Sequence, residues 1–177
     1  MRTHALIIAV GLLVACGKGS EKKSTSDKGF TKGSLNALLG SWESACINDA
    51  ESEGSQQFVL NIAEAEYQIT NETFADSNCA NKDLVFEQTG TYTDKNSTIQ
   101  IKPTEVFYTY VDAATVSYLN QSKFCGKNDW KTNQRTKVDA LACGGDVIDA
   151  STSTYKIEGD SLSLTSEGET TKLRRRK

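Results

Sequence analysis

The chain has 177 residues, with 20 Lys and Arg against 23 Asp and Glu, a formal net charge of −3, one histidine, one proline and five cysteines. That length fits one domain with or without a tail, and a mixture of 37% hydrophobic and 24% charged residues excludes collagen, a coiled coil and a multi-span membrane protein. A mildly acidic chain also lacks the basic face that binding to phosphates requires, so we expect no nucleic acid as partner.

The first fifteen residues have the pattern of an export signal. Arg2 gives a short positive start, and residues 5–15 form an apolar run of eleven residues, too short for a bilayer core, which needs about 20. The sequence that follows, Leu-Val-Ala-Cys at residues 13–16, resembles the lipobox of bacterial lipoproteins. In that class the cysteine is diacylated on its sulfur, the peptide is cut just before it, and the new N-terminus is acylated, for example with palmitate. The resemblance implies a signal peptide at residues 1–15 and lipidation of Cys16.

The residue after the lipobox bears on location. Gly17 rather than Asp follows the cysteine, and the sorting rules of Gram-negative lipoproteins then imply the outer membrane, with the protein facing the periplasm or the cell surface. Two or more acyl chains hold a protein stably at a bilayer where one does not. Cleavage would also remove His4, the only histidine. We therefore expect no Ser/His or Cys/His nucleophile and no His-ligated metal. We also expect that the protein is not an enzyme and has no cofactor.

Four cysteines remain once Cys16 is assigned to lipid, and they stand at Cys46, Cys79, Cys125 and Cys143. An even number in an exported chain predicts two disulfides, with three possible pairings. The sequential pairs Cys46–Cys79 and Cys125–Cys143 suit an up-and-down topology, in which neighbours along the chain are neighbours in space. The alternatives are a four-cysteine metal site, which a CxxC pair would favour and this sequence lacks, and free thiols.

The mature chain divides by composition. Residues 16–37 are expected to form a lipid-anchored flexible tether, because residues 17–34 are rich in Gly, Ser and Lys. The five lysines of that stretch could also lie along anionic headgroups. The folded domain is expected at residues 38–177.

The domain shows apolar and polar residues in alternation, which is typical of half-buried antiparallel strands. Strands are predicted around residues 58–62, 67–70, 84–86, 89–93, 99–102, 106–110, 155–157, 162–164 and 169–175. Turns are predicted at Asn71 and Glu72, at residues 94–96 and at residues 158–160, and Pro103 is placed between two strands. Residues 112–123 form either a short helix capped by Asp112 or an irregular loop. Eight or nine strands predict an all-β fold, an antiparallel up-and-down barrel or a sandwich.

Gly40-Ser41-Trp42 at the head of the first strand resembles the Gly-x-Trp motif of lipocalins and related calycins. In that family the Trp closes one end of an eight-stranded up-and-down barrel, and a basic residue of the last strand packs across its ring. In this sequence the resemblance implies that Arg174, or its neighbour Arg175 or Arg176, packs across the ring of Trp42. The cysteine spacing differs from the usual lipocalin one and no C-terminal helix follows, so the resemblance is to a lipocalin-like barrel. If the basic residues at the C-terminus do not cover Trp42, we expect them to form a solvated tail or a patch that faces the membrane.

The aromatic residues of the middle of the domain are the best indication of function. Phe86, Tyr92, Tyr108 and Tyr110 are candidates to line a pocket for a small apolar or amphipathic ligand. An eight-stranded interior can equally be filled by its own side chains. The first hypothesis is therefore an anchored ligand-binding barrel. The alternative is a packed envelope protein or inhibitor that contacts a protein partner through its loops, with residues 110–131 as the contact surface.

Overall fold

The structure is a computed structural model, and it describes residues 35–48, 53–139, 141–143 and 149–177. The expected signal peptide, Cys16 and nearly all of the expected tether lie outside these residues. No helix within the described ranges is long and apolar enough to cross a bilayer.

The described chain is almost entirely β-structure. The first half contains α1 (Leu35–Leu38), β1 (Gly40–Ser44), β2 (Ile47–Asn48), β3 (Ser55–Ile62), β4 (Glu66–Phe74), β5 (Lys82–Lys95) and β6 (Thr98–Tyr110). The second half contains α2 (Ala113–Ser122), η1 (Phe124–Gly126), β7 (Thr136–Val138), η2 (Leu141–Cys143), β8 (Ser151–Glu158), β9 (Ser161–Ser166) and β10 (Glu169–Arg175).

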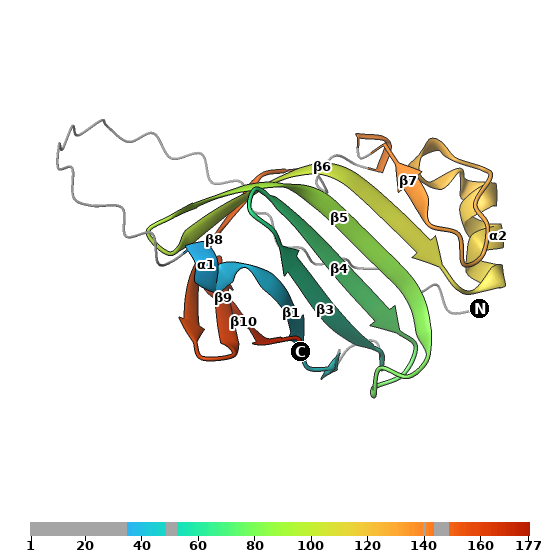
Figure 1. The fold of residues 1–177 in the computed structure, drawn as a ribbon. Helices are drawn as coiled ribbons and strands as arrows, with labels where there is room; N and C mark the ends of the chain where they lie inside the picture. The colour runs from blue at the N-terminus through green and yellow to red at the C-terminus, as the bar shows by residue number, and fades with distance from the viewer. Residues whose placement is uncertain (1–34, 49–52, 140, 144–148) are drawn as a thin grey trace. The chain divides into compact units, whose positions relative to one another are not determined.

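Eight of the strands close into an antiparallel barrel (Figure 1). Each barrel strand pairs with the next one along the chain, in the order β1, β3, β4, β5, β6, β8, β9, β10, and β10 pairs with β1 to close the ring. The short strands β2 and β7 pair with β3 and β6 outside this ring. The predicted up-and-down barrel with one short helix is confirmed, and β10 has the bounds expected from the sequence.

Two local predictions are wrong because strands β4 and β6 are longer than their apolar patterns suggest. Asn71 and Glu72, expected in a turn, lie within β4 and pair with Phe86 and Val85. Pro103 lies inside β6 rather than between two strands. The strand tolerates it because the pairing of β6 with β8 ends at residue 101 and that with β7 begins at residue 106, so proline's missing N–H faces a gap.

A register shift follows at the same level of the β5–β6 pair. Thr89 pairs with Glu105 and Gly90 pairs with Pro103, which leaves one extra residue on β6. Gly90 faces the carbonyl of Lys102 so closely that a Cβ at this position would collide with that oxygen. The two strands therefore need glycine here, to approach each other at the bulge.

Substituting Gly90 with alanine should destabilise the domain by about 2 kcal/mol or more, because the clash involves backbone atoms of the paired strand. The urea midpoint measures the effect. Gly159→Ala is the control: Gly159 has a φ of 59°, but no atom lies within 4 Å of the place that a Cβ would take, so a loss of about 1 kcal/mol is expected. Equal losses in the two variants would contradict the close approach.

The register assigns the inward side of every barrel strand, and two clusters of buried residues form on this inner side. The first, the floor cluster, fills the end of the barrel that α1 covers; it consists of Leu38, Trp42, Leu60, Ile62, Tyr67, Tyr92, Ile99, Leu162 and Leu173. The second, the plug cluster, lies under α2 and β7; it consists of Leu84, Val106, Tyr108, Tyr110, Val116, Leu119, Cys125, Trp130 and Val138.

Residues 111–139 are called the plug. Their buried side chains pack against the barrel wall and, with the wall residues, form the plug cluster. Of the two alternatives for residues 112–123, the helix is the one that forms: Asp112 is the N-cap of α2, and its carboxylate accepts from the Thr115 amide at 2.6 Å. Val116 and Leu119 of this helix are buried against the wall. Figure 1 shows α2 and β7 at the far end of β6 from the β5–β6 hairpin.

Candidate functional site

The inner face of the barrel wall between the two clusters is the candidate site. Strand pairing places Phe58 opposite Asn71, Asn71 opposite Phe86, and Phe86 opposite Tyr108. One level nearer the floor, Ile69 pairs with Gln88. Apolar side chains and amides thus alternate around the inner face of four adjacent strands.

These inward side chains are only half-buried, although they face the interior. Partial burial is shared by Phe58, Ile69, Asn71, Phe86, Gln88 and Ile101, together called the inner wall. In a barrel filled by its own side chains, inward residues at this level would be as buried as those of the floor cluster. Phe58, Ile69 and Ile101 pack against the floor cluster and Phe86 packs against the plug cluster, and each keeps part of its surface exposed to solvent.

The inner wall carries hydrogen-bonding groups among its apolar side chains. The hydroxyl of Tyr67 donates to Oε1 of Gln88 at 3.0 Å, and burial raises the pKa of Tyr67, so this phenol stays protonated. The side-chain oxygen of Asn71 is shielded from solvent and has no hydrogen-bond partner within the described part of the chain. An unpartnered shielded acceptor favours a ligand or water that donates to it.

The structure separates the four aromatic residues that the sequence proposed as ligand-lining. Phe86 lies in the inner wall. Tyr92 belongs to the floor cluster, and its hydroxyl donates to the carbonyl of Ala63 at 2.8 Å. Tyr108 and Tyr110 belong to the plug cluster and are stacked at 6.0 Å between ring centroids. The site thus has one of the four. Phe58 was missed because it lies outside the aromatic-rich middle of the domain, and Ile69, Asn71, Gln88 and Ile101 were missed because they are not aromatic.

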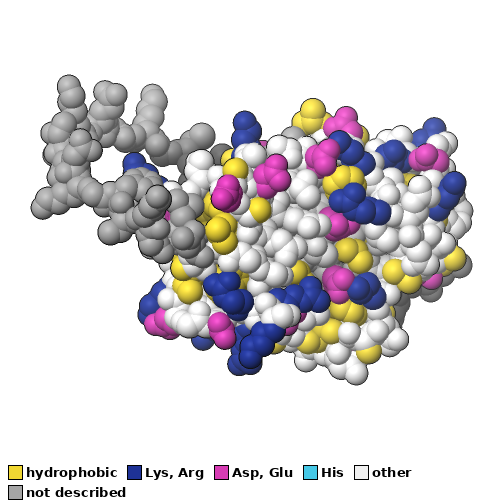
Figure 2. All heavy atoms as spheres, viewed as in Figure 1, with side chains coloured by type: hydrophobic (Ala, Val, Ile, Leu, Met, Phe, Trp, Pro, Cys, Tyr) yellow, Lys and Arg dark blue, Asp and Glu magenta, His cyan; other side chains and the backbone are white. Residues whose placement is uncertain are grey.

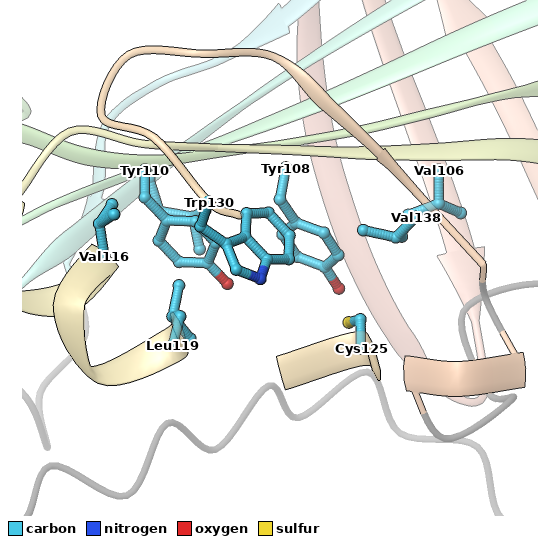
Figure 3. Packing of buried hydrophobic residues seen from close by; sticks show 9 residues of the cluster. Val106, Tyr108, Tyr110, Val116, Leu119, Cys125, Trp130 and Val138 are labelled. Carbon is cyan, nitrogen blue, oxygen red and sulfur yellow. The ribbon is translucent and has the colours of Figure 1, made fainter. Parts of the chain in front are cut away.

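Trp130 covers the two stacked tyrosines (Figure 3). Its ring stands edge-on to Tyr110 at 5.4 Å and to Tyr108 at 6.4 Å between centroids. Its backbone is fixed by Asn120, whose side-chain oxygen accepts from the Trp130 amide at 2.7 Å and whose side-chain amide donates to the Trp130 carbonyl at 3.1 Å. Burial raises the pKa of both tyrosines. The plug therefore closes this part of the interior.

The Gly-x-Trp motif lies at the opposite end, as the resemblance implies. Trp42 is completely buried, and its Nε1 donates to the carbonyl of Leu38 at 2.9 Å. The guanidinium of Arg175 lies 4.1 Å above its ring and donates to the carbonyls of Leu39 and Ala37 at 2.8 and 2.7 Å. One basic side chain thus joins the last strand, the Trp and the chain that leads into β1.

Arg174, the residue first proposed for this contact, does not make it. It pairs with Glu43 on one side and Ser161 on the other, and its side chain is exposed. Neighbouring residues of a strand face opposite sides, so only the residue paired with Trp42, which is Arg175, can reach the inward ring.

Both disulfides form with the predicted sequential pairing. Cys46–Cys79 ties the chain between β1 and β2 to the loop between β4 and β5, across a separation of 33 residues. Cys125–Cys143 joins η1 of the plug to η2 across 18 residues. The second bridge joins the middle of the plug to η2, just after the plug ends.

Two shallow depressions lie on the described surface, away from the inner wall. A shallow depression between η1 and β7 is lined by Cys125, Lys127, Lys137 and Val138, and another on the outside of the β5–β6 hairpin is lined by polar side chains. Within the described ranges, no three His, Cys, Asp or Glu side chains are placed to share a metal ion.

No family model matches the sequence, and no curated protein is significantly similar to it. The assignment of function therefore rests on the residues of the barrel itself.

Proposed function

We propose that the protein is a lipid-anchored, non-catalytic protein of the bacterial outer membrane that binds a small amphipathic ligand at the inner wall of its barrel. The observation that carries this proposal is the partial burial of inward apolar side chains, Phe58, Ile69, Phe86 and Ile101 among them. Covering such surface contributes about 25 cal/mol per Å² of apolar area removed from water.

The amides among these side chains indicate the chemistry of the ligand. An apolar body would contact Phe58 and Ile69, and a hydroxyl or amide group would donate to the free oxygen of Asn71. Protein pockets for small molecules combine these features, a mostly apolar lining with a few polar anchors. No charged side chain belongs to the inner wall as defined, which favours a ligand whose polar part is neutral.

The location follows from the sequence. The lipobox that ends in Cys16 supports anchoring by acyl chains, and Gly17 supports the outer membrane. Loss of His4 on cleavage would leave no imidazole for acid–base chemistry at neutral pH. Binding rather than turnover is the function that these features support.

A fluorescent amphipathic probe, N-phenyl-1-naphthylamine, tests the binding. The protein should bind it saturably, and Ile69→Trp should weaken binding at least about tenfold, because a larger side chain fills the space above the inner wall. Thr70→Trp is the matched control, since Thr70 is the next residue of β4 and faces outward. Absence of saturable binding, or the same affinity in both variants, would contradict the proposal.

A protein partner is the second candidate function, and the exposed surface of α2 and η2 favours it. Tyr118 of α2 is 67% exposed and Leu141 of η2 is 73% exposed, although both are large hydrophobic residues. Exposed aromatic and aliphatic anchors are typical of protein interfaces. Cross-linking in whole cells should capture a partner that a Tyr118→Ser/Leu141→Ser variant no longer captures, while both proteins bind the probe alike.

A further inference from the structure

Basic side chains gather along the outward side of the last strand. Lys172 and Arg174 of β10 and the two residues after it, Arg176 and Lys177, are all exposed. These four residues are called the basic edge. Lys172 pairs with Ser163, which pairs with Lys156 of β8, so one further lysine lies on the same outward face two strands away. Figure 2 shows Lys and Arg side chains gathered on the part of the surface near β9, β10 and the C-terminus.

Acidic residues offset only part of this charge. Glu43 pairs with Arg176 at 3.3 Å, and Glu158 pairs with Lys156 at 2.5 Å. Asp160 lies 4.0 Å from Arg175, but Arg175 is not part of the basic edge, because its side chain points inward and packs on the ring of Trp42. Within the described residues, Lys172, Arg174 and Lys177 form no ion pair.

The basic edge lies beside the point where the tether enters the domain. The amide of Arg176 donates to the carbonyl of Ser41 at 2.8 Å, and Arg175 bonds to carbonyls of residues 37 and 39. Residues 17–34 are all that separates Cys16 from α1 in the sequence. An acylated Cys16 would thus keep this end of the barrel near the bilayer.

We infer that the basic edge rests on the anionic headgroups of the membrane that holds the anchor, with the floor end of the barrel turned toward the bilayer. The inference rests on the anchoring part of the proposed function. Anionic headgroups attract clustered Lys and Arg close to the surface, and the attraction is screened within a Debye length. A tether that keeps the edge near the headgroups raises their effective concentration, so a few unpaired cations suffice.

The test uses the full-length lipidated protein in vesicles, either of phosphatidylcholine alone or of phosphatidylcholine with phosphatidylglycerol. Acetylation of lysine side chains by sulfosuccinimidyl acetate, which leaves the chain intact, is followed by mass spectrometry. Acetylation of Lys177 should be at least about fivefold slower on the anionic vesicles, and high salt should remove the difference. Acetylation of Lys123 and Lys127, in the plug, should proceed at the same rate on both.

Two variants of equal charge separate the basic edge from net charge. Lys172→Gln/Arg174→Gln should abolish the protection of Lys177, whereas Lys123→Gln/Lys127→Gln should keep it. Equal acetylation of Lys177 on the two kinds of vesicle, or protection that survives Lys172→Gln/Arg174→Gln, would overturn the inference. Retention on pure phosphatidylcholine reports the anchor, and probe titration reports the ligand site, so failure of either part of the proposed function is seen separately.

Discussion

Replacing Trp42 with alanine should cost the domain about 3–5 kcal/mol, the range for truncating a buried Trp. Trp42 is completely buried and touches three parts of the chain at once: Leu38 accepts from its indole N–H, Leu60 pairs with it on β3, and Arg175 covers its ring. Truncation removes the packing of the floor cluster and leaves the carbonyl of Leu38 without its donor. Urea unfolding followed by circular dichroism measures the loss.

The arginine pair of β10 gives a matched control for the same end of the barrel. Arg175→Gln should cost about 1–3 kcal/mol, because it removes a cation–π contact worth roughly 0.5–2 kcal/mol and two charge-assisted bonds to carbonyls. Arg174→Gln, one residue away and outward, should stay within about 0.5 kcal/mol. Equal effects in the two variants would contradict the closure described for Trp42.

That contrast marks a limit of the sequence. The Gly-x-Trp motif and the run of arginines indicated that a basic residue would cover Trp42, and the structure has one. Which arginine does so depends on the register between β1 and β10, and a slip of one residue exchanges the two faces of a strand. The sequence shows the alternation but does not fix the pairing, so Arg174 and Arg175 could not be separated.

The elements with local signals could be predicted well. The β8–β9 hairpin has two alternating arms around Gly159, and α2 begins at Asp112, a residue whose short carboxylate caps a helix. Elements that depend on distant pairing could not. Asn71 and its polar neighbours look like turn residues in the sequence. In the structure they belong to β4, which lies between β3 and β5, and these two strands pair with its backbone.

The same reasoning explains the candidate site. Aromatic residues in a predicted barrel indicate an interior, but not which part of it is open. Tyr108 and Tyr110 are closed off because Trp130, about twenty residues later in the chain, folds back over them. Ile69 pairs with Leu60 at the upper edge of the floor cluster, and Asn71 pairs with Phe58 and Phe86, which are themselves only half-buried, so both side chains stay partly exposed.

Replacing Trp130 with alanine should release the plug while the barrel stays folded. The side chain is 3% exposed and contacts Tyr108, Tyr110 and Phe124, so the local loss should reach about 3–5 kcal/mol. The plug cluster and the floor cluster share no residue, which makes separate opening of the plug the expected result. Trypsin sensitivity at Lys127 and Lys131 measures this opening, and near-constant circular dichroism shows that the barrel persists.

Probe binding then connects the plug to the proposed ligand site. Release of the plug should uncover Tyr108 and Tyr110, which continue the inner wall from Phe86, whose ring lies 5.3 Å from that of Tyr108. The Trp130→Ala protein should therefore bind more N-phenyl-1-naphthylamine than the wild type, and Ile69→Trp in this background should bind less. Tyr118→Ala, an exposed residue of the same plug, is the control and should change neither proteolysis nor binding. If plug and barrel of the Trp130→Ala protein unfold together in one cooperative transition, the two clusters form a single core. In that case the plug does not open separately, and the inner wall is not a site that the plug borders.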